Sequence, residues 1–315
     1  MGIKYLNRVL RSRCSEAIKQ IPLWNLKNKK IAIDTSIYLY RFKGEDALIE
    51  NFYLMVSLFR HYRITPLFVF DGKPPQEKYE EIKHRNQLKI EAENRYNVLE
   101  EKLEETNNDH DRQEIISKMQ DEKKNFVRIT RDDIESVQRL LDAYGIVYIT
   151  ANGEADELCY KLTKKKMVYG CLSEDMDLFV YGCERVYRYL SLLNNTLVEY
   201  DMRKILNILG LTQTEFREIC VLGGTDYNEG CDNIYKSLTL FEKYKKSRTC
   251  IDFYKWLQKG EMIDDYQKLI STYLMFDRFP IQLESEVKKL QITNKRIQRR
   301  ELREILVNDG FIFVN

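Results

Sequence analysis

Residues 171–180 read CLSEDMDLFV, and this short stretch sets acidic residues among apolar ones. The apolar flanks indicate buried chain, yet Glu174, Asp175 and Asp177 stand together in the middle. Two like charges about 4 Å apart repel each other by about 4 kcal/mol, even at an effective dielectric constant of about 20. A fold that keeps these carboxylates together therefore needs a partner that neutralises their charge.

Short β-rich runs recur along the chain, and each is followed by sequence with a helical pattern. Strands of this length that are apolar on both faces are typical of parallel sheets covered on both sides. The alternation predicts an α/β fold with a mostly parallel central sheet covered by helices. We expect strands at 29–33, 64–70, 145–150, 167–172 and 185–190.

Two regions depart from this alternation. Residues 78–131 are highly charged and free of glycine, which predicts helices that project from the body and bury little. After Asp201 the pattern is helical throughout, so we expect a core at 1–200 and a helical region at 201–315. Within the second region, one helix is expected to begin after Thr212, with Glu215 completing the cap, and to end at Gly223.

The composition limits the classes of protein to consider. The 315 residues are 43% hydrophobic, and 51 Lys and Arg nearly balance 49 Asp and Glu, so net charge does not indicate a polyanionic partner. Seven cysteines without a CxxC pair or a Cys/His cluster are typical of a reducing compartment and argue against zinc or a disulfide framework. Without a signal peptide or a transmembrane run, we expect a soluble, intracellular protein with no membrane partner.

Acidic residues follow four of the predicted strands at the point where each strand ends. In open parallel sheets, ligands bind beyond the carboxyl ends of the strands. One such residue alone is most often a helix cap or a turn former, but four strands that supply them together indicate a site. Carboxylates without His or Cys favour Mg²⁺ or Mn²⁺, and two such ions could serve phosphodiester hydrolysis. Glu174 is the weakest member, because its neighbours at alternate positions can face the edge while it points away.

Six motifs carry a resemblance to a known family. The stretches MGIKYL, IAIDTSIYLYRF, FVFDGKPPQEK, GEADELCYKL, CLSEDMDLFVYG and LGGTDYNEG resemble, in order and spacing, the flap endonucleases of the XPG-like 5′ nuclease superfamily. The resemblance implies a PIN-like nuclease fold, with 1–200 as the nuclease core. It implies a metal-dependent, structure-specific 5′ nuclease that cuts DNA near a 5′ flap, gap, nick or free 5′ end, in replication, repair or recombination.

The resemblance also implies a cofactor and its ligands. Two Mg²⁺ ions, with Mn²⁺ able to substitute, would be held by Asp34, Asp71, Glu154, Asp156, Asp175, Asp177 and Asp226. Asp156 departs from the family pattern, because many relatives carry the longer Glu there.

Further residues match positions that handle DNA in the family. The charged stretch would form a helical arch, with Lys78 and Arg85 as the cations at its base that contact the scissile phosphate. These two are seven positions apart, so on a helix they share a face. Arg128 and Arg131 resemble a basic pair on the returning arch helix. The set implied in catalysis is Asp34, Asp71, Lys78, Arg85, Glu154 and Asp175, and the set implied in DNA binding is Gly2, Tyr40, Lys78, Arg85, Arg128, Arg131 and Lys236.

Two departures from the family pattern bear on specificity. The segment CDNIYKSLTLF resembles a helix–turn–helix that grips duplex phosphates, but it lacks the glycines of the usual K⁺-binding turn, although Lys236 could still contact a phosphate. The interval between Asp34 and Asp71 is shorter than in cellular flap endonucleases, which gives weight to gapped or exonuclease substrates over double flaps. No sliding-clamp peptide of the QxxLxxFF type is present, and the compact chain suits a viral or reduced member. We expect a monomer located in the nucleus or, for a viral member, at a cytoplasmic replication site.

Two alternatives stay open on the sequence. One is a catalytically silent nuclease fold that serves as a nucleic-acid or protein scaffold; such a protein should lose acidic residues, whereas all seven are present. The other is a PIN-type RNase with the same acidic edge, which would need neither a long arch nor a duplex-binding helical region.

Overall fold

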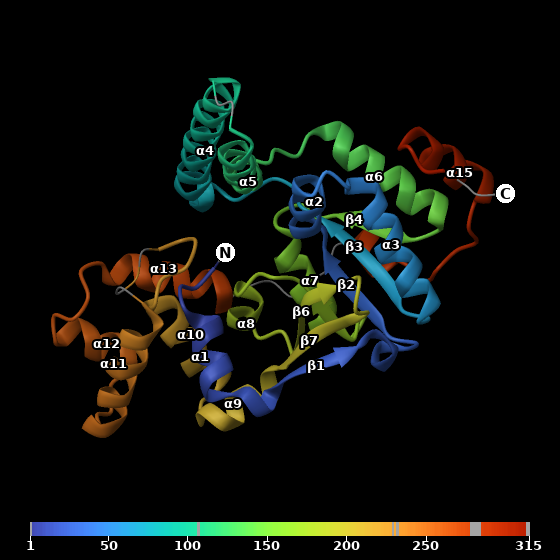
Figure 1. Ribbon diagram of the computed structural model, residues 1–315. Helices are drawn as coiled ribbons and strands as arrows, with labels where there is room; N and C mark the ends of the chain where they lie inside the picture. The colour runs from blue at the N-terminus through green and yellow to red at the C-terminus, as the bar shows by residue number, and fades with distance from the viewer. Residues whose placement is uncertain (1, 106–107, 229, 231–232, 278–284, 313–315) are drawn as a thin grey trace. The chain divides into compact units, whose positions relative to one another are not determined.

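The computed structural model describes residues 2–105, 108–228, 230, 233–277 and 285–312 (Figure 1). The chain forms two compact units, which we describe separately. The sheet unit comprises Met1–Thr35, Leu58–Lys73 and Val147–Asn294. The helical unit comprises Ser36–Ser57, Pro74–Ile146 and Lys295–Asn315. The division expected from the sequence, into a core at 1–200 and a helical region at 201–315, does not coincide with these two compact units. It stays a prediction about which part of the chain carries which function.

The sheet unit is built on a seven-stranded sheet in the order β1-β7-β6-β5-β2-β3-β4 (Figure 1). Strands β2 to β6 are joined in parallel, whereas β7 runs antiparallel to both β6 and β1. The mostly parallel α/β sheet is thereby confirmed. The strands are β1 (Ile18–Pro22), β2 (Lys30–Asp34), β3 (Thr65–Phe70), β4 (Val147–Thr150), β5 (Gly170–Leu172), β6 (Arg185–Ser191) and β7 (Thr196–Asp201).

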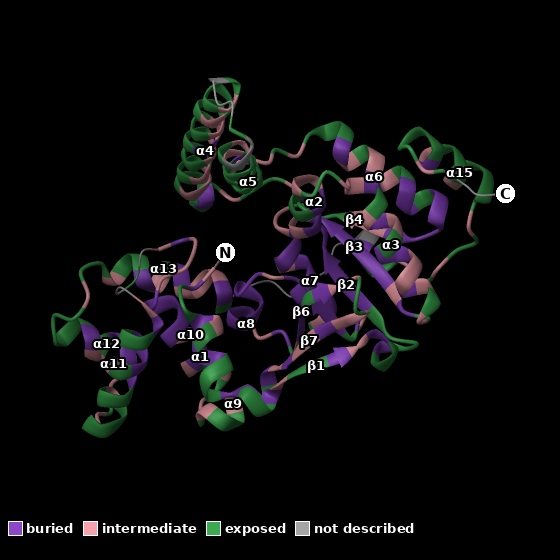
Figure 2. Cartoon of the chain, viewed as in Figure 1, coloured by how far each residue is buried: buried purple, intermediate pink, exposed green. Residues whose placement is uncertain are grey.

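All five expected strands form, and the two that were missed are the antiparallel ones. Their sequences, IKQIP and TLVEYD, mix apolar and polar residues instead of forming the continuous apolar runs of β2 and β3. Antiparallel strands need burial on one face only, and β1, the outermost strand of the sheet, tolerates Pro22 because an edge position leaves backbone donors unused. Figure 2 shows the contrast, with buried residues concentrated in the central strands.

Helices cover the sheet and continue the chain after it. Helix α7 packs on β2, β3 and β5, and the helix expected after Thr212 forms as α10, with the Thr212–Glu215 capping box and Gly223 at its end. Within the described residues, every helix is too short or too polar to cross a bilayer. The helices of the sheet unit are α1 (Leu6–Arg13), α7 (Ala155–Lys164), α8 (Asp177–Tyr181), α9 (Met202–Leu209), α10 (Gln213–Leu222), α11 (Ile234–Ser247), α12 (Phe253–Lys259), α13 (Tyr266–Asp277) and α14 (Ser285–Lys288).

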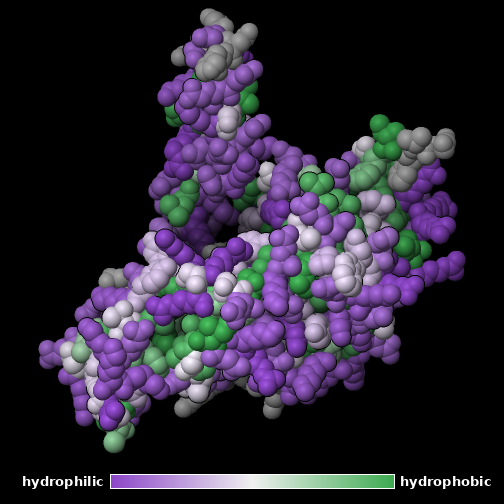
Figure 3. Space-filling view, turned by 60° about the horizontal axis from the view of Figure 1, so that its bottom comes forward, coloured by the Kyte–Doolittle hydropathy of each residue, from purple (hydrophilic) through white to green (hydrophobic). Residues whose placement is uncertain are grey.

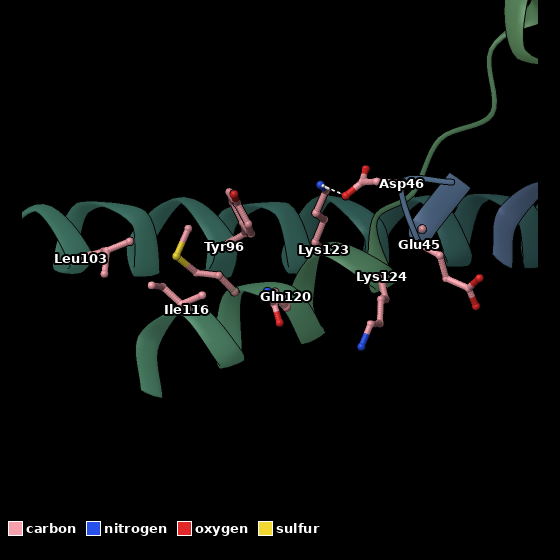
Figure 4. A pocket seen from close by; sticks show the side chains of 10 residues that line it. Glu45, Asp46, Tyr96, Leu103, Ile116, Gln120, Lys123 and Lys124 are labelled. Atoms are coloured by element: carbon pink, nitrogen blue, oxygen red, sulfur yellow. Dashed lines mark hydrogen bonds and ion pairs between the residues drawn. The ribbon is translucent and has the colours of Figure 1, made fainter. Parts of the chain in front are cut away.

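The charged stretch folds as a pair of packed helices, α4 (Tyr79–Glu105) and α5 (Asp109–Asn125), within the helical unit. Beside them lies a small pocket of about 380 Å³ (Figure 4). Its lining includes the apolar side chains of Ile116 and Met119, the ring of Tyr96, and Lys123 and Asp46, which form an ion pair. Figure 3 shows mostly hydrophilic residues on the face of this helix pair that it presents. The expectation of helices that bury little is confirmed. The unit also contains most of α2 (Thr35–Gly44) and α3 (Leu48–His61), together with α6 (Arg131–Tyr144) and α15 (Arg299–Asn308).

Candidate active site

Parallel pairing brings the first acidic residues to one edge of the sheet. Asp34 is the last residue of β2 and pairs with Val69 of β3, two positions before Asp71. Just beyond β5, the hydroxyl of Ser173 donates a hydrogen bond of 2.8 Å to Asp34 Oδ2 and accepts one of 3.0 Å from the backbone N–H of Asp175. Ser173 is fully buried and ties two of the predicted ligands together. The sequence shows Ser173 between the strand and the acidic residues, but we predicted no role for it.

The amino-terminal segment reaches the same acids. The backbone N–H of Gly2 donates to Asp226 Oδ1 at 3.3 Å. A Cβ atom on Gly2 would lie 2.9 Å from Asp177 Oδ1 and 3.0 Å from Asp175 Oδ1, and its φ of +76° already favours glycine. The structure therefore brings Gly2, Asp175, Asp177 and Asp226 together, with room beside two carboxylates that a side chain would fill.

The remaining acids lie around the start of α7. Asp71 Oδ1 accepts a 2.8 Å hydrogen bond from the backbone N–H of Ala155, and Asp156 Oδ1 accepts one of 2.6 Å from the N–H of Glu157. Glu154 accepts a 2.6 Å hydrogen bond from the hydroxyl of Tyr227. Burial raises the pKa of Tyr227, as do Tyr181 and Glu154 nearby, so the phenol stays protonated and donates. Tyr227 was missed in the sequence, although it stands next to Asp226 in the LGGTDYNEG motif.

Buried neighbours feel the charge of several acids at once. The pKa of Cys159 is raised by its burial first and then by Asp34, Asp156 and Asp71. Burial also raises the pKa of Tyr181 strongly, and Asp156, Asp177 and Glu154 add to that shift. Acids from different loops therefore act on the same thiol and phenol.

The donor set fits a hard divalent cation, because all seven predicted ligands offer carboxylate oxygens and Gly2 leaves space beside two of them. In the part of the chain that the structure describes, however, no three His, Cys, Asp or Glu side chains are grouped so that they could hold one ion. Hydrogen bonds from N–H and O–H groups each hold one carboxylate oxygen of six of these acids, Asp34, Asp71, Glu154, Asp156, Asp175 and Asp226. The residues fit a divalent cation in chemistry.

Glu174 lies apart from this group. Its carboxylate pairs with Arg188 at 3.2 Å and accepts a hydrogen bond of 2.5 Å from the backbone N–H of Tyr189. The expectation that Glu174 points away from its acidic neighbours is confirmed.

Gly72 links two of the loops that carry acids. Its N–H donates to Gly153 O at 2.8 Å, and a Cβ atom there would lie 1.8 Å from the backbone oxygen of Ala151. We expect Gly72→Ala to lower the free energy of unfolding by about 1–3 kcal/mol, because the two backbones must move apart. Chemical denaturation measures this, with Gly153→Ala as the control, because neither glycine has a positive φ and a Cβ atom on Gly153 would meet only the Glu157 carboxylate, at 3.3 Å. Equal stability of Gly72→Ala and wild type would contradict the close packing of the loops.

The predicted arch cations belong to the helical unit. Lys78 is the last residue of a 3₁₀ turn, Gln76–Lys78, that leads directly into α4. The Lys78 residue is buried, with 7% of its surface exposed. Arg85 lies on α4 and forms an ion pair with Glu81 at 2.7 Å. We expected Lys78 and Arg85 to share one face of a single regular helix. Because Lys78 lies in the 3₁₀ turn before α4, the spacing of a regular helix does not apply to this pair.

The placement of Arg128 and Arg131 on the returning helix was wrong. Helix α5 ends at Asn125, Arg128 lies in the link that follows, and Arg131 is the first residue of α6. The link contains Val127, Ile129 and Thr130, which are poor helix formers, and Thr130 starts α6 through a capping box. Both arginines are exposed and form ion pairs, Arg128 with Glu93 and Arg131 with Glu135.

Two further predicted DNA-binding residues are accessible. Tyr40 is 44% exposed, and the Nζ atom of Lys89 lies 4.5 Å from the centre of its ring. Lys236 is exposed in the first turn of α11, which Asn233 caps. The turn that bears on K⁺ includes residues 229, 231 and 232, which lie outside the described residues.

Family models match two stretches of the chain. Residues 1–92 match the XPG N-terminal domain, and residues 145–226 match the XPG I-region. These stretches contain the carboxylates described above together with Gly2, Tyr40, Lys78 and Arg85.

Curated relatives and solved structures agree with this match. Flap endonuclease 1 of Encephalitozoon cuniculi is 32% identical over 265 residues, which cover 78% of this chain and 73% of the relative. For flap endonuclease 1 of Chlamydomonas reinhardtii, identity is 33% over 246 residues, 72% of this chain and only 59% of the relative.

Structural similarity extends over nearly the whole chain. The catalytic core of Rad2 in complex with DNA substrate has a TM-score of 0.65 at 21% identity, covering 98% of this chain and 95% of that one. Flap endonuclease-1 from Methanococcus jannaschii has a TM-score of 0.64 at 22% identity, covering 93% and 90%. These neighbours establish a PIN-like nuclease fold, and the sequence relatives establish the lineage: the chain belongs to the flap endonuclease family of XPG-type nucleases.

Proposed function

We propose that this protein is a metal-dependent, structure-specific 5′ nuclease that hydrolyses phosphodiester bonds of DNA near junctions of single strand and duplex. The observation that carries the proposal is that acids from the ends of β2, β3 and β5 are linked to one another and to the start of α7: Ser173 joins Asp34 to Asp175, and Asp71 accepts from the N–H of Ala155. Membership in the flap endonuclease family supports it. The Rad2 neighbour, whose structure contains a DNA substrate, supports DNA as the partner.

The cofactor we propose is a pair of Mg²⁺ ions, which Mn²⁺ could replace. When bound, such ions promote ionisation of water and neutralise charge on the leaving oxygen. A GEN1 neighbour was solved with product DNA and a Mg²⁺ ion. The residues that would hold the ions are Asp34, Asp71, Glu154, Asp156, Asp175, Asp177 and Asp226.

Groups around the acids would keep them in position for this task. Ser173 holds Asp34 and the backbone of Asp175, so it limits how far these two can separate. Tyr227 directs one oxygen of Glu154 through its hydroxyl. A carboxylate that is held by a donor loses less side-chain freedom when its other oxygen takes up a ligand.

The helical unit would supply the cations that handle the substrate. Lys78 and Arg85 would contact the scissile phosphate, and Arg85 would exchange its ion pair with Glu81 for that contact. Tyr40 offers an exposed ring on which a base could stack. Arg128, Arg131 and, on α11 of the sheet unit, Lys236 would bind backbone phosphates, with residues 201–315 as the region that holds the duplex.

Mapping of cleavage products tests this function. We expect cleavage next to the junction when Mg²⁺ is supplied with matched duplexes carrying a 5′ flap, a gap, a nick or a blunt 5′ end. Cleavage should be faster on a DNA flap than on the same flap made of RNA. Binding of all these duplexes without cleavage would instead indicate a scaffold, and preference for single-stranded RNA would indicate a PIN-type RNase.

A further inference from the structure

The sheet unit has a pocket near the amino ends of β2 and β5, which we call the edge pocket. This pocket has a volume of about 580 Å³, and its lining includes Trp24, Lys27, Tyr169, Tyr187 and Glu199. Trp24 and Lys27 precede β2, and Tyr169 precedes β5, so these residues lie at the amino ends of strands whose carboxyl ends carry the acids. The five residues of β2 span about 16 Å, which separates the edge pocket from the acids.

Trp24 is one of the residues that line the edge pocket. Its side chain is 63% exposed, although indole is among the most costly side chains to leave in water. It lies on a short 3₁₀ turn, Leu23–Leu26, whose two leucines are buried. The leucines hold the turn in place, so the indole is presented outward from a fixed backbone.

Cationic side chains lie beside Tyr169, a second aromatic residue in the lining of the edge pocket. Tyr169 is 37% exposed, and its ring centre lies 4.5 Å from the Nζ atom of Lys29 and 4.4 Å from the guanidinium carbon of Arg185. Lys27 lies in the lining itself. Lys27 and Lys29 would attract an anionic group near Tyr169, whereas the charge of Arg185 is partly balanced by Glu199, 3.9 Å away.

The lining of the edge pocket also contains residues with hydrogen-bonding groups. Tyr187 of β6 and Glu199 of β7 are directly paired, and Glu199 is half-buried, with burial raising its pKa against the effect of Arg185. The buried hydroxyl of Tyr187 has no hydrogen-bond partner among the described residues. Gly170 permits this arrangement, because a Cβ atom there would lie 2.7 Å from the Tyr187 ring.

An exposed indole, flanking cations and a carboxylate acceptor form a combination that suits one kind of ligand. A nucleobase can stack on the indole and donate an amino N–H to Glu199, while its phosphate approaches Lys27 and Lys29. We propose that the edge pocket binds one nucleotide of a single-stranded nucleic acid, with its base stacked on Trp24. This inference goes beyond the proposed nuclease function and does not depend on it.

The fluorescence of Trp24 can report binding of a ligand in the edge pocket. The chain has two tryptophans, and Trp256 packs against Tyr244 and Phe253 in the helical region, so Trp256→Phe leaves Trp24 as the single indole. The variant is titrated in chelator with a short oligodeoxycytidylate and, separately, with cytidine 5′-monophosphate. We expect saturable quenching of Trp24 by both probes, with the oligonucleotide bound more tightly. Equal affinity for the two would overturn the assignment to a strand.

Binding of a labelled oligodeoxycytidylate, followed by fluorescence anisotropy, supplies the second readout. Trp24→Ala should raise the Kd about tenfold or more, as loss of one stacked base does, and Trp24→Phe should have a smaller effect. Leu193→Ala is the matched control, because Leu193 is 89% exposed on the β6–β7 turn and does not line the edge pocket. Unquenched Trp24, or a Kd that Trp24→Ala leaves unchanged, would overturn the proposal. Either result leaves the nuclease function untouched, since no cleavage is measured.

Discussion

Replacing Asp175 and Asp177 together by asparagine is expected to slow single-turnover cleavage of a 5′-flap duplex about 10³-fold or more, the equivalent of about 4 kcal/mol in the barrier. The two carboxylates lie beside Gly2 and are buried. Asparagine keeps an oxygen that can accept the hydrogen bond from the N–H of residue 177, but it supplies no charge for a cation. Affinity for the duplex should change little.

Two controls separate loss of chemistry from loss of fold. Glu174→Gln removes a charge from the same stretch, but Glu174 pairs with Arg188 away from the other acids, so cleavage should stay near the wild-type rate. Without metal, the double asparagine variant should unfold at the same temperature as wild type or a higher one, because like-charge repulsion is relieved. A sharp drop in that temperature would mean that the two acids are structural.

Lys78→Ala and Arg85→Ala are each expected to slow single-turnover cleavage by about 10²–10³, the usual effect of removing a charge-assisted contact made near the transition state. Lys78 is buried and Arg85 is held by Glu81, so neither is a freely solvated surface charge. Duplex affinity should change less than about tenfold. The double variant should be little slower than the single ones, because both side chains would act on one phosphate.

The control for the arch residues is Lys102→Ala, an exposed position near the end of α4. It should cleave at nearly the wild-type rate. Thermal unfolding of Lys78→Ala must accompany the kinetics, because truncating a buried side chain can also weaken the fold. Wild-type rates for both Lys78→Ala and Arg85→Ala would show that these cations do not position the substrate.

The sequence predicted those parts of the fold that local pattern determines. The parallel strands form continuous apolar runs because both faces are covered, and the cap at Thr212 is a local hydrogen-bond arrangement. Strands β1 and β7 were missed because their mixed polar and apolar residues form no continuous apolar run. Arg128 was misplaced because the resemblance to the family suggested a helix that the β-branched residues of the link do not favour.

The acids of the site could be predicted, whereas the groups that hold them could not. An acidic residue at the end of each strand is visible in the sequence, and the sheet brings those ends together. Ser173 and Tyr227 act through hydrogen bonds across 139 and 73 positions of the chain, and a serine or tyrosine in such a motif has many possible partners. Only the three-dimensional arrangement identifies which partner each of them has.

Cleavage of a 5′-flap duplex at saturating enzyme, with and without divalent cation, tests most directly whether these acids form a metal-dependent nuclease site. After removal of metal with EDTA, we predict no cleavage while the duplex stays bound. Addition of Mg²⁺ or Mn²⁺ in excess of the chelator should restore cleavage beside the junction for the wild type but not for the Asp175→Asn, Asp177→Asn variant. Undiminished cleavage in EDTA would contradict the account.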